Sequence, residues 1–358
     1  MWLIRGRGTD VADGRVPGGA PASHEPASVT RTRTLLIALF FACSIVLLSL
    51  LRFNWRETVP LPHFGKRATL RAPGDSACYT AYVEWFRGRE VGDRLYPPFS
   101  YRPLAPWMAS HLPFDAMTSL NFLNILALLV ALTFLDRILA GLGCSRRQRY
   151  LGAALFVFSF PTFYYSTLGY VDPVGIAFLM AGVHFALRGK WSALAVVTAA
   201  GTLAKETMVL VLPVAATRLA CDDSPRVRRV LVIVALCACY LITTLAVRDW
   251  SPGPSAYVWA PTLHTLQANL ARPGAWATSL LTFGLPGVLA LLSWRTLLRR
   301  DTRQRHTSLV PLLFGLLSAL AAFVWSAGSA YTEGRFVWLS YPFLIPVTVL
   351  GWGDRKLR

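Results

Sequence analysis

Residues 34–51 read TLLIALFFACSIVLLSLL, and this stretch contains no charged side chain. At 1.5 Å per residue, a helix of that length covers roughly 27 Å, close to the hydrocarbon thickness of a bilayer. Similar apolar blocks follow along the 358 residues, of which 54% are hydrophobic and only 15% are charged. A soluble protein of this size needs more polar surface to cover its core. The sequence therefore predicts an all-α, polytopic membrane protein.

The basic residues indicate how these spans are oriented. The chain carries a net charge of +18, which in a soluble protein would suggest a nucleic acid partner. Here the arginines stand in short clusters between the apolar blocks, which is the pattern that sets membrane topology. Arg31 and Arg33 precede the first block, so the N-terminus is expected inside. We therefore expect a multi-pass protein of the cell (inner) membrane and no nucleic acid partner.

The same rule predicts a transmembrane helix bundle of about ten helices, with about eight full spans, one hairpin of short helices and both termini inside. Residues 1–33 are rich in Gly, Pro, Ala and Arg and are predicted to be a disordered cytoplasmic N-terminus. Residues 34–351 are the predicted transmembrane domain, 52–118 its large outer loop, and 352–358 a cytoplasmic tail. The full spans are expected at 34–51, 119–140, 150–168, between 173 and 188, 230–247, 276–294, 308–326 and 336–350.

The apolar stretch 191–220 is interrupted by Lys205 and Glu206. Basic clusters at 188–190 and 226–229 flank it, so it must cross the membrane an even number of times. Two helices of about 14 residues reach only about 21 Å each, so their tip is expected in a protein-lined cavity below the outer surface. Adjacent helical positions do not face each other, and buried charges at this depth are costly. We therefore expect Lys205 and Glu206 to find partners elsewhere and to contribute to a ligand site.

In the large outer loop, the segment 74–88 is predicted to contain a helix, with Asp75 at or near its N-cap and Gly88 after its end. Tyr79 follows Asp75 at i+4 and therefore shares its face. Two interpretations of Asp75 are open. It either only caps this helix, or it is a general base held at the membrane surface.

Further polar residues are expected at the outer ends of the spans. Arg102 lies among aromatic residues and prolines, where a guanidinium either satisfies loop carbonyls or holds a phosphate bidentately. Asp172 is followed by Pro173, which favours a helix-capping role over ligand binding. Glu333 and Arg335 form either a rim pair or a ligand contact. The candidate substrate-binding residues are therefore Arg102, Lys205, Glu206, Glu333, Arg335, Tyr79 and Asp172.

The chain carries none of the motifs of nucleotide-fuelled or zinc-dependent soluble enzymes. It has no Walker loop, no Gly-rich dinucleotide fingerprint, no His-x-x-x-His pair and no Gly-x-Ser-x-Gly elbow. We therefore expect no soluble nucleotide cofactor, and we assign no metal ligands.

Three short motifs lie at comparable places in a known family. GDSACY at 74–79 opens the helix in the outer loop, LAKET at 203–207 separates two short apolar helices and precedes LP at 212–213, and EGRF at 333–336 precedes an apolar block with YP at 341–342. This arrangement resembles the GT-C superfamily of polytopic glycosyltransferases, which use polyprenyl-phosphate-linked sugars. It is most similar to the bacterial dolichyl-phosphate-mannose mannosyltransferase-like membrane proteins.

The resemblance implies Asp75 as the catalytic base and places the basic candidates Arg102, Lys205 and Arg335 around the donor phosphate. Many members carry an acidic pair in the first outer loop, whereas here Ser76 follows Asp75. This departure leaves open whether a divalent metal ion takes part.

The resulting hypothesis is a transferase that moves a sugar from a polyprenyl-phosphate donor to a hydroxyl of a glycan, lipid or protein acceptor at the outer face of the membrane. A lipid-linked donor is already activated, which agrees with the missing nucleotide motifs. Two alternatives stay open. One is a secondary transporter or lipid flippase, a class that often has broken helices in paired positions. The other is a non-catalytic membrane subunit of the same fold.

Overall fold

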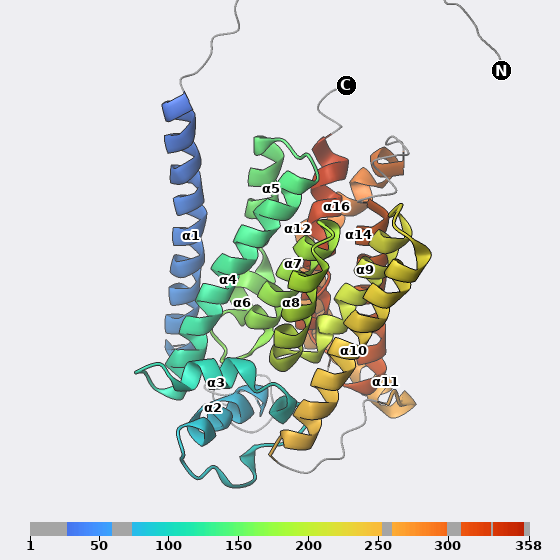
Figure 1. Ribbon diagram of the computed structural model, residues 1–358. Coiled ribbons are helices and arrows are strands. Elements are labelled where there is room, and N and C mark those ends of the chain that lie inside the picture. The colour runs from blue at the N-terminus through green and yellow to red at the C-terminus, as the bar shows by residue number, and fades with distance from the viewer. Residues whose placement is uncertain (1–26, 59–73, 253–259, 299–308, 331, 354–358) are drawn as a thin grey trace, which may run out of the picture. The chain divides into compact units, whose positions relative to one another are not determined.

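The computed structural model describes residues 27–58, 74–252, 260–298, 309–330 and 332–353. Every regular element in these ranges is helical, with fifteen α-helices and three short 3-10 helices (Figure 1). The chain separates into two units, Met1–Phe40 and Phe41–Arg358. The first unit contains the beginning of α1 (Ala27–Thr58), whose first seven residues overlap the predicted N-terminal segment 1–33. The rest of that predicted segment, 1–26, lies outside the described residues. The candidate site and the pocket described below lie in the second unit.

Five helices in the described residues are long and apolar enough to cross a membrane, so the protein is a multi-pass helical membrane protein. They coincide with predicted spans. The apolar segments are Thr32–Arg52 in α1, Ala116–Gly141 (α4), Arg226–Trp250 (α10), Pro273–Trp294 in α12 (Pro273–Leu298), and Val310–Ser329 (α14). The helix α12 bends at Gly284, whose backbone φ of +33° is one that residues other than glycine rarely adopt.

Two predicted spans are broken, and their prediction as continuous helices was wrong. Span 150–168 consists of α5 (Arg146–Val157) and α6 (Phe160–Tyr165), and span 336–350 consists of α15 (Gly334–Trp338) and α16 (Tyr341–Gly353). The hydroxyls at the breaks, Ser159 and Ser340, each donate a 2.7 Å hydrogen bond to the carbonyl oxygen three residues earlier. Both serines open a Ser-aromatic-Pro sequence, and proline suits the first turn of a new helix.

The predicted interruption at Lys205 and Glu206 is confirmed. The helix α7 (Asp172–Leu187) is followed by α8 (Trp191–Ala204), after which Lys205 is extended, with φ −166° and ψ 132°. A 3-10 turn, η3 (Glu206–Leu210), then leads into α9 (Val211–Ala220). Both short helices pack against α7, so the interruption is surrounded by protein.

The described part of the predicted outer loop is helical and packs against the end of the bundle. It contains α2 (Gly74–Phe86), η1 (Gly92–Arg94), η2 (Phe99–Tyr101) and α3 (Leu104–Ser110), and α2 and α3 lie beside the first residues of α4 (Figure 1). Arg87 fixes this arrangement, because its guanidinium donates to the carbonyl oxygens of Leu112 at 3.0 Å and Phe114 at 2.8 Å. Beyond α10, the short helix α11 (Leu263–Leu270) packs on α14 and α12.

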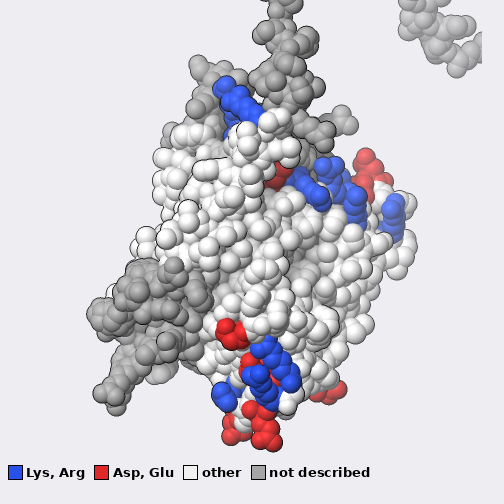
Figure 2. All heavy atoms as spheres, turned by 90° about the vertical axis from the view of Figure 1, so that its left-hand side faces the viewer, with Lys and Arg blue, Asp and Glu red and all other residues white. Residues whose placement is uncertain are grey.

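Charged side chains are distributed as in a protein with a lipid-facing belt. On the face drawn in Figure 2, most Lys, Arg, Asp and Glu side chains gather toward two ends, and a broad band between them is nearly uncharged. The exposed apolar side chains of α10 fit such a belt, since Leu241, Ile242 and Leu245 are each more than half exposed.

Candidate functional site

The candidate site begins at Arg102, which links the outer segment to the interruption after α8. Its Nε donates to Glu206 Oε2 at 2.8 Å, its second terminal nitrogen pairs with Glu206 Oε1, and its Nη1 donates to the Tyr79 hydroxyl at 2.6 Å. Arg102 is only 3% exposed. Burial opposes its charge, but Glu206 outweighs this and raises the pKa of Arg102 well above its usual value. Burial also raises the pKa of Tyr79, so its phenol stays protonated.

Lys205, the neighbour of Glu206, pairs with a different carboxylate. Its ammonium donates to Asp172 Oδ1, and both side chains are almost fully buried. The aliphatic part of Lys205 lies on Gly175 of α7, where an added Cβ would meet Lys205 carbons at 3.3 Å. The prediction that Lys205 and Glu206 find separate partners is confirmed. The capping role favoured for Asp172 is wrong, because Val171 occupies the N-cap of α7 and Asp172 lies inside the helix.

Arg335 joins the other acidic residues. Its guanidinium pairs with Asp75 in the first turn of α2, and it lies 4.0 Å from Asp172 Oδ2 and 3.9 Å from Glu333. It also lies over the Tyr170 ring, at 5.0 Å. Ser76 donates to the Leu168 carbonyl oxygen at 2.5 Å, which holds the start of α2 against the turn before α7.

Glu333 is a buried carboxylate whose pKa is raised. Its burial raises its pKa, Arg335 acts in the opposite direction, and Asp75 and Asp172 raise the pKa further. Its net pKa is therefore above the ordinary value, so Glu333 takes up a proton more readily than an exposed glutamate. With Glu333 protonated, the cluster balances its carboxylates against its cations.

All eight candidate residues thus belong to one network of contacts at the end of the bundle. Tyr79, Arg102 and Glu206 form one branch, and Lys205, Asp172, Arg335, Asp75 and Glu333 form the other. The branches meet at the adjacent residues Lys205 and Glu206. We name this set the charged network.

Sequence reasoning missed the aromatic residues beside Arg335. Tyr165 stacks against Trp338 with ring centroids 6.0 Å apart, and against Tyr170 at 6.1 Å. The Tyr165 hydroxyl and the Trp338 indole N–H are buried and have no hydrogen-bond partner among the described residues. Such groups require a partner, which water or a ligand hydroxyl can supply. Their signal in the sequence was the two Ser-aromatic-Pro breaks, which place α6 and α15 side by side.

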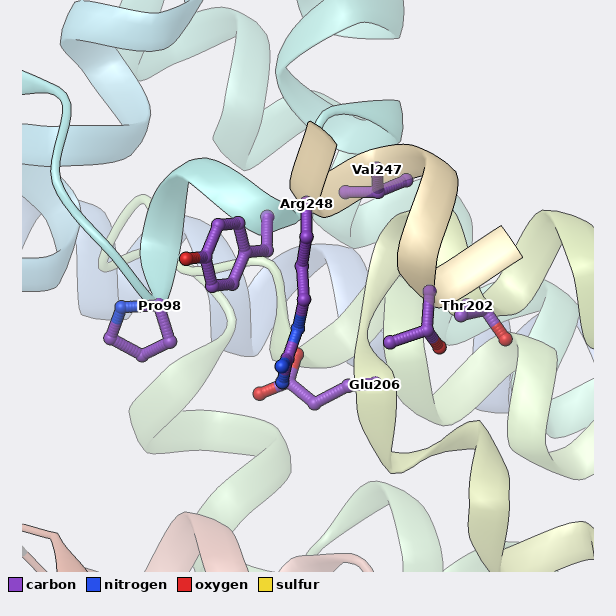
Figure 3. A pocket seen from close by; sticks show the side chains of 7 residues that line it. Pro98, Thr202, Glu206, Val247 and Arg248 are labelled. Atoms are coloured by element: carbon purple, nitrogen blue, oxygen red, sulfur yellow. The ribbon is translucent and has the colours of Figure 1, made fainter. Parts of the chain in front are cut away.

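A pocket adjoins the other branch of the charged network. Its cavity has a volume of about 70 Å³ and is partly open to solvent. Figure 3 shows the Arg248 side chain extending into it toward Glu206, with Pro98 on one side and Thr202 on the other. The guanidinium of Arg248 lies 5.4 Å from the centre of the Tyr101 ring. The residues that line the pocket are Pro98, Tyr101, Thr202, Glu206, Thr244, Val247 and Arg248.

The described residues contain no group of three or more His, Cys, Asp or Glu side chains placed to hold a metal ion. The carboxylates of Asp75, Asp172 and Glu206 each face a Lys or Arg instead. We therefore assign no metal role to these residues.

No protein-family model matches the chain, and no curated protein sequence matches it.

Proposed function

We propose that this protein is a membrane glycosyltransferase, which moves a sugar from a polyprenyl-phosphate donor to an acceptor hydroxyl at the outer face of the cell membrane. The observation that supports it best is the position of Asp75, a partly exposed carboxylate at the start of α2 held by a buried Arg335. In this proposal the charged network faces outside, and both chain termini lie in the cytoplasm.

In the proposed reaction, Asp75 takes the proton of the acceptor hydroxyl as that oxygen attacks the anomeric carbon of the donor sugar. The bond between this carbon and the phosphate oxygen breaks, and the phosphate leaves with both electrons. The ion pair with Arg335 holds the Asp75 carboxylate in place for this step. The cations of the charged network stabilise the negative charge that develops on the leaving phosphate.

The other residues of the network have supporting roles in this proposal. Arg102 and Lys205 already bind Glu206 and Asp172, so they act mainly through their electric field and by holding η3 against the outer segment. The Tyr165 hydroxyl and the Trp338 N–H, which have no hydrogen-bond partner in the part of the chain that the structure describes, are candidate partners for hydroxyls of the sugar.

The experiment is sugar release from a panel of radiolabelled polyprenyl-phosphate hexoses by the purified protein, comparing wild type with Asp75→Asn. Loss of a general base typically slows turnover by about 10²–10⁴-fold. The matched control is Asp136→Asn, because Asp136 of α4 also pairs with an arginine, Arg149, but lies outside the charged network. Release by Asp75→Asn within a few-fold of wild type would rule out the base, and no release from any donor would count against the transferase.

One observation favours a second candidate, a secondary transporter or lipid flippase. Two helices besides α8–α9 are broken, α5–α6 and α15–α16, both at a Ser-aromatic-Pro sequence. Broken helices in related positions are common in transporters. Uptake of a labelled lipid or sugar into proteoliposomes that persists in Asp75→Asn, without sugar release, would support the transporter instead.

A further inference from the structure

The cations of the charged network do not explain which residue first binds a phosphate. All three nitrogens of the Arg102 guanidinium already have partners. Lys205 forms a buried ion pair with Asp172, and Arg335 pairs with Asp75. An anion reaching any of them must displace a buried carboxylate or phenol, which is costly. A phosphate therefore needs a cation that is not committed to another group.

Arg248 is such a cation. It lies in the last turn of α10, is exposed, and has no carboxylate partner among the described residues. The Tyr101 ring supports one face of its guanidinium, which leaves the N–H edges available for bidentate contact with a phosphate. Glu206, on the facing wall of the pocket, is neutralised by Arg102. The pocket therefore offers one uncompensated positive charge.

The frame of the pocket is held by hydrogen bonds between separate elements. The Ser251 hydroxyl at the end of α10 donates to the Ser100 carbonyl oxygen of η2 at 2.7 Å, and the Tyr240 hydroxyl donates to the Glu206 carbonyl oxygen at 3.0 Å. These contacts fix α10 against the outer segment and against η3. The pocket is thus built by α8, α10 and the outer segment together rather than by a single loop.

The surroundings of the pocket indicate a lipid. The helix α10 supplies Thr244, Val247 and Arg248 to the lining, and its apolar side chains Leu241, Ile242 and Leu245 are exposed, as expected of a lipid-facing surface. Most of its lining surface is apolar, with Pro98 and Val247 among the lining residues. An anionic head group at Arg248 would let its hydrocarbon chain continue along α10 into the bilayer.

We infer that this pocket binds the phosphate of the lipid-linked sugar donor, with Arg248 as its direct ligand and Tyr101 as the support of the guanidinium. The inference rests on the proposed function, because it identifies the bound lipid with the donor. It assigns Arg102 and Lys205 to positioning and Arg248 to binding.

The test measures calorimetric binding of geranyl phosphate to the purified protein in a fixed detergent, with inorganic phosphate and geraniol as separate titrants. We expect geranyl phosphate to bind far more tightly than either, and Arg248→Gln to weaken it about tenfold or more. Arg248→Lys keeps the charge but not the planar fork and should be intermediate. The control is Arg229→Gln, at the opposite end of α10. Thr244→Phe, which fills the pocket, should also weaken binding without touching Arg248.

Several outcomes would overturn the inference. These are equal binding by wild type and Arg248→Gln with unchanged thermal stability, geraniol binding as tightly as geranyl phosphate, or inorganic phosphate binding as tightly, which would indicate a free-phosphate site. The sugar-release assay keeps the two proposals separate. Arg248-dependent geranyl phosphate binding without sugar release from any donor would remove the transferase but retain the lipid-phosphate pocket. Asp75-dependent release with an unchanged KM in Arg248→Gln would remove only the role of Arg248.

Discussion

Replacing Asp172 with Asn, Lys205 with Met, and both together separates the strength of their ion pair from the packing of each side chain. The Lys205 and Asp172 side chains are 3% and 2% exposed, so water does not reach a charge left alone there. Two magnitudes compete for such a site. Removing one member of a buried ion pair typically costs about 3–5 kcal/mol, whereas polar contacts between membrane helices average only about 0.6 kcal/mol. Because both side chains are buried, we expect the larger of these two costs.

The structure also predicts an asymmetry between the two single variants. Lys205→Met leaves Asp172 with a second cation, because Arg335 lies 4.0 Å from its Oδ2. Asp172→Asn leaves Lys205 without its carboxylate, so we expect this variant to cost about 3–5 kcal/mol and Lys205→Met less. The double variant should cost less than Asp172→Asn alone, because no uncompensated charge remains, which gives a coupling energy of about 2 kcal/mol or more.

The assay is reversible unfolding in mixed micelles followed by tryptophan fluorescence. Asp136→Asn is the control, since the Arg149–Asp136 pair is 30% and 43% exposed and should be worth about 1 kcal/mol or less. If Asp172→Asn costs no more than this control, or if the two single effects simply add, the buried pair is solvated independently and the reasoning fails.

Three further predictions concern the elements that support the charged network. Arg87→Met should destabilise the protein by about 1–2 kcal/mol in the same unfolding assay, because it removes hydrogen bonds to the carbonyl oxygens of Leu112 and Phe114. Arg89→Met, at a 69% exposed side chain, should change it by less than about 0.5 kcal/mol. Gly334→Ala should lower both stability and sugar release, because its Cβ would lie 2.3 Å from the Thr278 carbonyl oxygen; Gly274→Ala, with open space around it, should lower neither. The free energy of unfolding should fall as pH rises from 4.5 through the raised native pKa of Glu333, because only the folded state retains that proton, and Glu333→Gln should flatten this slope.

The sequence predicted those parts of the fold whose signal is local. An uncharged apolar block of sufficient length indicates a span, and the pair Lys205–Glu206 inside such a block indicates an interruption. The start of α2 at Gly74 follows from the same kind of local pattern. The topology predicted from the basic clusters also places the candidate residues at one end of the bundle.

The sequence could not predict which side chains pair, because the partners lie far apart along the chain. Glu206 binds Arg102, Lys205 binds Asp172, and Asp75 binds Arg335 only once the spans have packed. Asp172 illustrates the limit: Pro173 after it made a helix cap the better local interpretation, and packing against Lys205 overrode it. The breaks at Ser159 and Ser340 were missed because hydropathy averages over the few residues that interrupt a helix.

The shortness of the helices around the charged network has a consequence for biosynthesis. The helices α7, α8 and α9 contain 16, 14 and 10 residues, so they measure about 24, 21 and 15 Å, less than the roughly 30 Å of hydrocarbon. We therefore expect none of them to leave the translocation channel as an independent transmembrane unit. Stable insertion of each helix then depends on synthesis of the others and of α4, against which α7 packs. We therefore expect the ribosome to have completed α9 before any of the three is stably inserted, and a chain that stops after α7 to be extracted and degraded.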